Sequence, residues 1–140
     1  MSNKNKIIDR VYNITFKINA DHRGSLVAVE GKNNLNFAIN RVFYMYGSDP
    51  GAIRGRHANR DSTMCFMCIK GSCKILVDNG KDKETFFLDN PAKGLICEPM
   101  TWKELFDFSL DCILMVICDT NYDVGEYITN YDDFKAELNK

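Results

Sequence analysis

The sequence is poor in the side chain that most often carries acid–base or metal chemistry, because only two of its 140 residues are histidines, His22 and His57. A charge excess is also missing: 18 Lys and Arg face 19 Asp and Glu, a formal net charge of −1. Such a balance does not attract nucleic acid or a membrane surface. Apolar runs such as Cys112–Cys118 are too short to span a bilayer, and the polar N-terminus lacks the apolar segment of an export signal. We expect a cytoplasmic protein with neither nucleic acid nor membrane as partner.

Nothing in the chain marks a domain boundary. The sequence has only 3 prolines, and it contains no repeat, linker or low-complexity tract. Its length is enough to close one hydrophobic core. We therefore expect residues 1–140 to form a single domain.

Short segments of β-forming residues recur along the chain. Arg41–Tyr46 alternates in character, whereas Thr63–Ile69 is continuously apolar, as in a strand buried on both faces. The Asn-Gly step within Asp78–Lys81 favours a tight hairpin turn. The pattern predicts an all-β sandwich, jelly roll or closed barrel, followed by a short C-terminal helix over Tyr131–Leu138. The other predicted strands are Ser25–Glu30, Ser72–Val77, Glu84–Leu88, Leu95–Glu98, Lys103–Phe108 and Cys112–Asp119.

The six cysteines lie mostly in apolar, strand-like segments. A disulfide framework needs an oxidising compartment, which the absence of an export signal disfavours. Cys65 and Cys68 have zinc-like spacing, but residues three apart on a strand point to opposite faces. We expect small buried hydrophobic residues rather than zinc ligands.

His57 lies in the cationic segment Arg54–Arg60, which contains three arginines. Arginine binds phosphate through paired hydrogen bonds, and nearby cations lower the pKa of a histidine and keep it a neutral base. The segment therefore favours an anion site with His57 as base, the alternative being a solvated loop histidine. His22, in Asp21-His-Arg-Gly24, is more readily explained as part of a turn.

A metal site at His57 is not expected. Small β-barrels often hold a metal through His-x-His, a downstream Glu and a later His, but here the second histidine is Asn59 and no later histidine follows. One imidazole and an amide hold a transition metal poorly.

A second polar stretch, Asn90–Phe108, contains the single tryptophan. Trp102 beside Lys103 can line a barrel mouth and stack on a base or sugar, or it can be a partly buried core residue. Asp107, between two phenylalanines, requires a partner for its charge.

Several motifs follow one another across nearly the whole chain. They are Asp21-x-Arg-Gly-Ser-Leu-Val-Ala-Val-Glu30, Asn40-Arg-Val-Phe-Tyr44, Arg54-Gly-x-His-Ala58, Gly71-Ser-Cys-Lys74, Leu88-Asp-x-Pro-x-x-Gly94, Trp102, Asp107-Phe-Ser109 and Tyr122-Asp through Tyr131-Asp-x-Phe134. In this order and spacing they resemble the nucleotide-sugar 3,4-ketoisomerases, cupin-type enzymes with an RmlC-like jelly roll that act on dTDP-4-keto-6-deoxyglucose.

The resemblance implies a cupin-type jelly-roll homodimer with exchanged N-terminal strands, no metal and no organic cofactor. It also implies an isomerase that moves the sugar carbonyl from C4 to C3 through an enediol, with His57 as the base, in the synthesis of 3-amino-3,6-dideoxy sugars for surface glycans. Arg41 and Arg54 match positions near the diphosphate or sugar, and Tyr44 lies on a strand expected to face the barrel interior. The candidate substrate-binding residues are Arg23, Arg41, Tyr44, Arg54, Arg60, Trp102 and Lys103, and the candidate catalytic residues are His57 and Asn59.

Two positions depart from the family pattern. Asn59 stands where the family has a second histidine, and Lys103 stands where a histidine commonly follows the tryptophan. Three interpretations are open: His57 makes both proton transfers, His22 or Lys103 supplies the acid, or the reaction has changed. The alternatives to an isomerase are a nucleotide-sugar epimerase using the same enolisation and a non-catalytic nucleotide-sugar-binding barrel.

Overall fold

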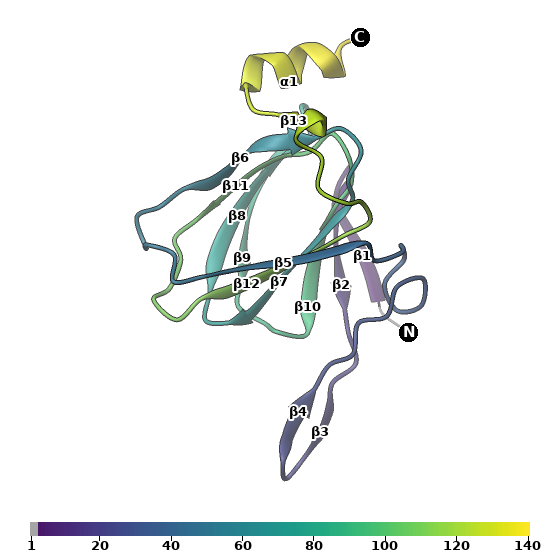
Figure 1. Cartoon of the computed structure of the whole chain (residues 1–140), viewed down its shortest axis with the longest axis vertical. Coiled ribbons are helices and arrows are strands. Elements are labelled where there is room, and N and C mark those ends of the chain that lie inside the picture. Colours follow the sequence, from purple (N-terminus) through teal and green to yellow (C-terminus); the bar gives the residue numbers. More distant parts are fainter. Residues whose placement is uncertain (1–2) are drawn as a thin grey trace.

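Two antiparallel sheets face each other and form a jelly-roll barrel in the computed structural model, which describes residues 3–140 (Figure 1). The first sheet has six strands in the order β1-β2-β10-β7-β12-β5, and the second has five in the order β13-β6-β11-β8-β9. The six strands of the first sheet are β1 (Asn3–Ile8), β2 (Val11–Thr15), β10 (Lys93–Cys97), β7 (Met64–Lys70), β12 (Ile113–Cys118) and β5 (Arg41–Tyr46). The five of the second are β13 (Tyr127–Ile128), β6 (Arg54–Asn59), β11 (Trp102–Phe106), β8 (Cys73–Asp78) and β9 (Lys83–Leu88).

The main core lies between the two sheets, and a second core covers the outer face of the six-stranded sheet. Strand β7 serves both, because Phe66 and Cys68 belong to the inner cluster and Cys65 and Met67 to the outer one. This confirms that the apolar β7 sequence is buried on both faces, and that Cys65 and Cys68 point in opposite directions. All six cysteines are free and buried.

The prediction for Ser25–Glu30 is wrong as a single core strand. Residues Gly24–Leu26 form the short β4, which pairs with β3 (Asn19–Asp21) in an exposed hairpin that projects from the barrel (Figure 1). Val27 and Val29 leave the hairpin and pack on the outer core cluster. Their apolar character therefore comes from covering a sheet rather than from joining it.

Strand β6 is a further difference from the prediction, which placed Arg54–Asn59 in a polar segment between strands. Its first three residues are exposed, so their sequence lacks the apolar signal of a strand. Pairing with β11 and β13 nevertheless makes β6 an interior strand of the second sheet.

The predicted C-terminal helix is confirmed as α1 (Tyr131–Leu138). Asn130 caps its N-terminus by accepting a hydrogen bond from the Asp133 amide. The helix covers one end of the barrel, where Phe134 is fully buried against Trp102 (Figure 1). Within residues 3–140, no helix is long and apolar enough to cross a membrane.

Candidate active site

A bulge in β6 directs His57 toward the barrel interior. On the paired β11, Lys103 lies opposite His57 and Glu104 opposite Gly55, so Arg56 is an extra residue. Gly55 and Arg56 both have positive φ, at 81° and 57°, and a Cβ on Gly55 would lie 3.0 Å from the Lys103 carbonyl oxygen. Bulges of this kind redirect side chains next to active sites. Here Arg56 is exposed, whereas His57 is half-buried.

His57 lines a cavity of about 140 Å³ between the two sheets. Its polar lining residues come from the second sheet and include a base, two cations and a phenol, whereas β5 and β7 supply an apolar wall. The polar side chains are those of Arg54, His57, Lys103 and Tyr127, and the apolar ones those of Phe43, Met45, Met64, Phe66 and Leu105.

The environment of His57 keeps its imidazole neutral. Burial, and then the positive charge of Lys103, lower the pKa of His57 from 6.5 to about 4. The ring lies beside Tyr127, with 4.7 Å between ring centroids. At neutral pH the side chain is therefore unprotonated and available as a general base.

Lys103 is a buried lysine with only 2% of its surface exposed. Its Nζ donates to Asn59 Oδ1 at 3.1 Å and to the Thr101 carbonyl oxygen at 3.2 Å. Burial lowers the pKa of Lys103, which makes its ammonium a stronger acid than that of an exposed lysine. An ammonium has three hydrogens, and these two bonds use two of them.

Asn59 connects Lys103 to a buried carboxylate. Its amide donates to Glu126 Oε1 at 2.9 Å, and Glu126 also accepts from the backbone amides of Asp61 and Ser62, each at 2.9 Å, and from the Ser62 hydroxyl. Burial alone would raise the pKa of Glu126, but these hydrogen bonds together lower it. Asn59 itself is fully buried and is not among the cavity-lining residues.

Arg41, on β5, has one hydrogen-bond donor without a partner in the described structure. Its guanidinium carbon lies 5.3 Å from the centre of the Phe43 ring and 5.6 Å from that of Tyr122, and its Nη2 donates to Cys118 Sγ at 3.5 Å. The buried Nε has no hydrogen-bond partner in the described structure. Burying an unpaired donor costs free energy, so this N–H is an unsatisfied group in the described structure.

Two predicted binding residues lie away from the cavity on exposed surfaces. Arg23 is in the projecting β3–β4 hairpin, as is His22, and pairs with Asp21 at 2.6 Å. Tyr44 is 64% exposed on the outer face of β5, since the alternation of that strand turns Phe43 and Met45 inward. The expectation that Tyr44 faces the barrel interior is therefore corrected.

Two other predicted binding residues have structural partners instead. Arg60 pairs with Glu137 of α1 at 2.8 Å. Trp102 is 5% exposed, donates to Glu104 at 3.0 Å and contacts the aromatic rings of α1, so it is a core residue rather than a lining of the barrel mouth.

The sequence analysis did not identify Glu126 and Tyr127. Glu126 is the last residue of a short 3₁₀ helix, Val124–Glu126, and Tyr127 follows it. The segment lies within the motif from Tyr122 to Phe134, but neither residue was singled out in it. The two-residue strand β13 then pairs Tyr127 with Asn59 and brings both side chains to the site. Only this tertiary pairing reveals their place.

A jelly-roll barrel with a histidine and a buried lysine lining an interior cavity has the architecture of a cupin-type protein. The fold is shared with the rmlC epimerase of Mycobacterium tuberculosis, which has a TM-score of 0.75, 15% identity, and coverage of 89% of this chain and 71% of the other. The chain belongs to the FdtA family, whose model (FdtA: WxcM-like, C-terminal) matches residues 9–139.

Two relatives support the same assignment. The chain is 41% identical over 127 residues to the TDP-4-oxo-6-deoxy-alpha-D-glucose-3,4-oxoisomerase of Aneurinibacillus thermoaerophilus, covering 91% of both chains. A crystal structure of a 3,4-ketoisomerase from Thermoanaerobacterium thermosaccharolyticum, in a His-to-Asn mutant form with TDP-4-keto-6-deoxyglucose bound, has a TM-score of 0.91 and 34% identity over 94% of this chain and 95% of the other. The predicted family and fold are confirmed.

Proposed function

We propose that this protein converts dTDP-4-keto-6-deoxy-D-glucose into the corresponding 3-keto sugar, using His57 as the base at carbon. The observation that carries the proposal is the interior cavity in which a neutral His57 lies opposite the buried Lys103. The named activity of the 41% identical relative supports the substrate. The 3-keto product suits an aminotransferase that installs a 3-amino group in sugars for surface glycans.

In the proposed mechanism His57 removes the hydrogen of C3, and the electron pair forms the C3–C4 double bond. The Lys103 ammonium gives a proton to O4 as negative charge develops there, which yields a neutral enediol. The Lys103 amine then takes the proton from O3, the C3 carbonyl forms, and the His57 imidazolium returns a proton to C4. Both residues end in their starting protonation states.

This assignment gives Lys103 the part that a second histidine would otherwise play. Asn59 then acts as a positioning residue, because its two bonds join Lys103 to Glu126 and a carboxamide does not ionise near neutral pH. Arg54 and Arg41 are proposed to bind the diphosphate: the first lines the cavity, and the second has an unpaired Nε.

A proton NMR time course in deuterated buffer tests the reaction. We expect the C3 proton signal of dTDP-4-keto-6-deoxyglucose to disappear as a 3-keto product forms, with some protium carried from C3 to C4 by His57. Exchange at C3 without carbonyl migration would point to an epimerase instead. Binding of dTDP without any turnover would support the alternative of a non-catalytic nucleotide-sugar-binding protein.

We also propose a homodimer. On β5, the side chains of Val42, Tyr44 and Tyr46 are 52%, 64% and 73% exposed and form an apolar row on the outer face of an edge strand. Contiguous exposed apolar surface of this kind is typical of interfaces. Light scattering on the purified protein should give twice the 16.0 kDa chain mass, and Tyr44→Glu should shift it toward one chain.

A further inference from the structure

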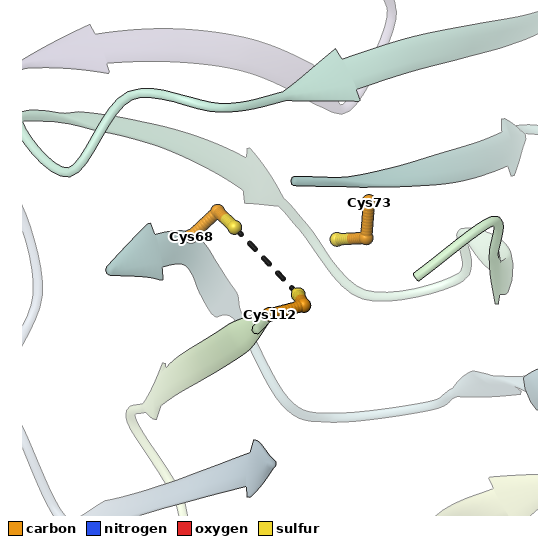
Figure 2. A group of neighbouring side chains, drawn as sticks. All are labelled: Cys68, Cys73 and Cys112. Carbon is orange, nitrogen blue, oxygen red and sulfur yellow. Dashed lines mark hydrogen bonds between the residues drawn. The ribbon is translucent and has the colours of Figure 1, made fainter. Parts of the chain in front are cut away.

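Three buried cysteines converge at one end of the barrel, and the proposed reaction has no use for them. Cys68 lies near the end of β7, Cys73 begins β8, and Cys112 immediately precedes β12. Their sulfur atoms all lie within 4.8 Å of one another, and each side chain is no more than 3% exposed. Figure 2 shows the three side chains pointing toward a common centre.

The spacing of two of these sulfurs matches that of thiolates that share a metal ion, and the third lies within 4.8 Å of both. Cys68 Sγ and Cys112 Sγ are 3.8 Å apart. Two ligands that each lie about 2.3 Å from one ion, at a tetrahedral or trigonal angle, are separated by about 3.8–4.0 Å. A disulfide would need the two sulfurs at about 2.05 Å, so Cys68 and Cys112 are free thiols in hydrogen-bonding contact.

The donor set is soft and limited to three. Among residues 3–140 no histidine, carboxylate or further cysteine joins the group. Structural zinc sites almost always have four protein ligands, whereas thiolate-only sites with fewer ligands suit the soft cation Cu(I). We propose that Cys68, Cys73 and Cys112 form a three-coordinate thiolate site for Cu(I).

In the metal-free state the Cys68 thiol contacts backbone carbonyl groups. Its Sγ lies 3.2 Å from the Lys70 carbonyl oxygen and 3.4 Å from that of Gly71. A bound ion would displace the thiol protons of the three cysteines, as metal binding to cysteine generally does.

A short turn separates the cluster from solvent. Residues 109–111 lead into Cys112, and Leu110 at the tip of this turn is 84% exposed. On β7, Met64 and Phe66 line the substrate cavity, and Cys68 lies further along the strand. The two sites can thus be tested separately.

The test is an anaerobic titration of the reduced full-length protein with Cu(I), in competition with a chromophoric Cu(I) chelator. We expect one ion per chain, an ultraviolet thiolate-to-Cu(I) charge-transfer band, and an X-ray absorption spectrum with three sulfur neighbours and no nitrogen or oxygen. The absorption spectrum is recorded on the unaltered chain, so this result does not depend on a variant folding.

Matched variants locate the ion. Cys112→Ala should weaken Cu(I) binding about a hundredfold or more, whereas Cys97→Ala, which removes an equally buried thiol outside the cluster, should not. Circular dichroism and dTDP binding establish that each variant is folded. Failure to compete with the chelator, equal effects of the two variants, or nitrogen and oxygen neighbours would overturn the proposal. Tighter binding of Zn²⁺ through a fourth, non-sulfur ligand would replace the Cu(I) assignment.

Discussion

Replacement of Lys103 by glutamine should raise the pKa of His57. Glutamine retains a donor for Asn59 and for the Thr101 carbonyl but removes the positive charge from the site. A cation opposite His57 disfavours the imidazolium, so its loss must shift the pKa upward.

The structure sets the direction of this shift and its rank. Together, burial and Lys103 lower the pKa of His57 from 6.5 to about 4, with burial the larger cause and Lys103 the second. Lys103→Gln removes the smaller of these two causes, so it should raise the pKa of His57 while burial continues to disfavour the imidazolium. Weak opposing contributions from the Gly55 backbone and Glu126 remain in the variant.

Nitrogen-15 NMR of the imidazole measures this value directly. With only two histidines in the chain, His22→Gln leaves His57 as the single imidazole signal. Lys83→Gln, on the exposed strand β9, is the matched control and should leave the titration unchanged. A midpoint near 6.5 in the parent protein, or the same midpoint with and without Lys103, would refute the argument. Circular dichroism defines the pH range in which the fold is intact.

Three further outcomes are expected. His57→Asn should lower kcat by about 10²–10⁴-fold while dTDP binding persists, as measured by the NMR assay and by thermal shift; unchanged turnover would exclude His57 as the base. Phe134→Ala should cost about 3–5 kcal/mol of unfolding free energy in denaturant titration, because Phe134 is fully buried on the inner face of α1, whereas Lys140→Ala should cost little. The pKa of Glu126 is lowered in the folded protein, so its ionised form stabilises the fold above pH 4.5, and this contribution is lost on acidification. The difference in unfolding free energy between the parent and Glu126→Gln should therefore shrink below that pH. A difference that stays constant with pH would contradict this prediction.

The elements that were predicted best are those in which the hydrophobic pattern of the sequence matches the burial of the side chains. Arg41–Tyr46 and the helix Tyr131–Leu138 were predicted with the bounds that the structure has. The apolar β7 was predicted within one residue at each end. By contrast, β6 could not be identified from periodicity, because its exposed residues are polar and its bulge interrupts the alternation.

The site was predictable only in part for a similar reason. His57 could be identified because histidine is rare in this sequence and arginines surround it. The resemblance to a known family also matched it to the first histidine of that family's motif. Glu126 did not stand out, because its importance comes from contacts with Asn59 and Ser62 more than sixty positions away. A local sequence pattern cannot predict contacts between residues so far apart in the chain.

The buried chain of contacts from Lys103 through Asn59 to Glu126 has an evolutionary consequence. A histidine at position 59 would remove the amide that joins the Lys103 ammonium to the Glu126 carboxylate. Lys103 would keep its bond to the Thr101 carbonyl but lose its described side-chain acceptor in a buried place. Lys103 and Asn59 are therefore expected to change together rather than one at a time. Once established, the pair constrains which later substitutions its lineage can accept.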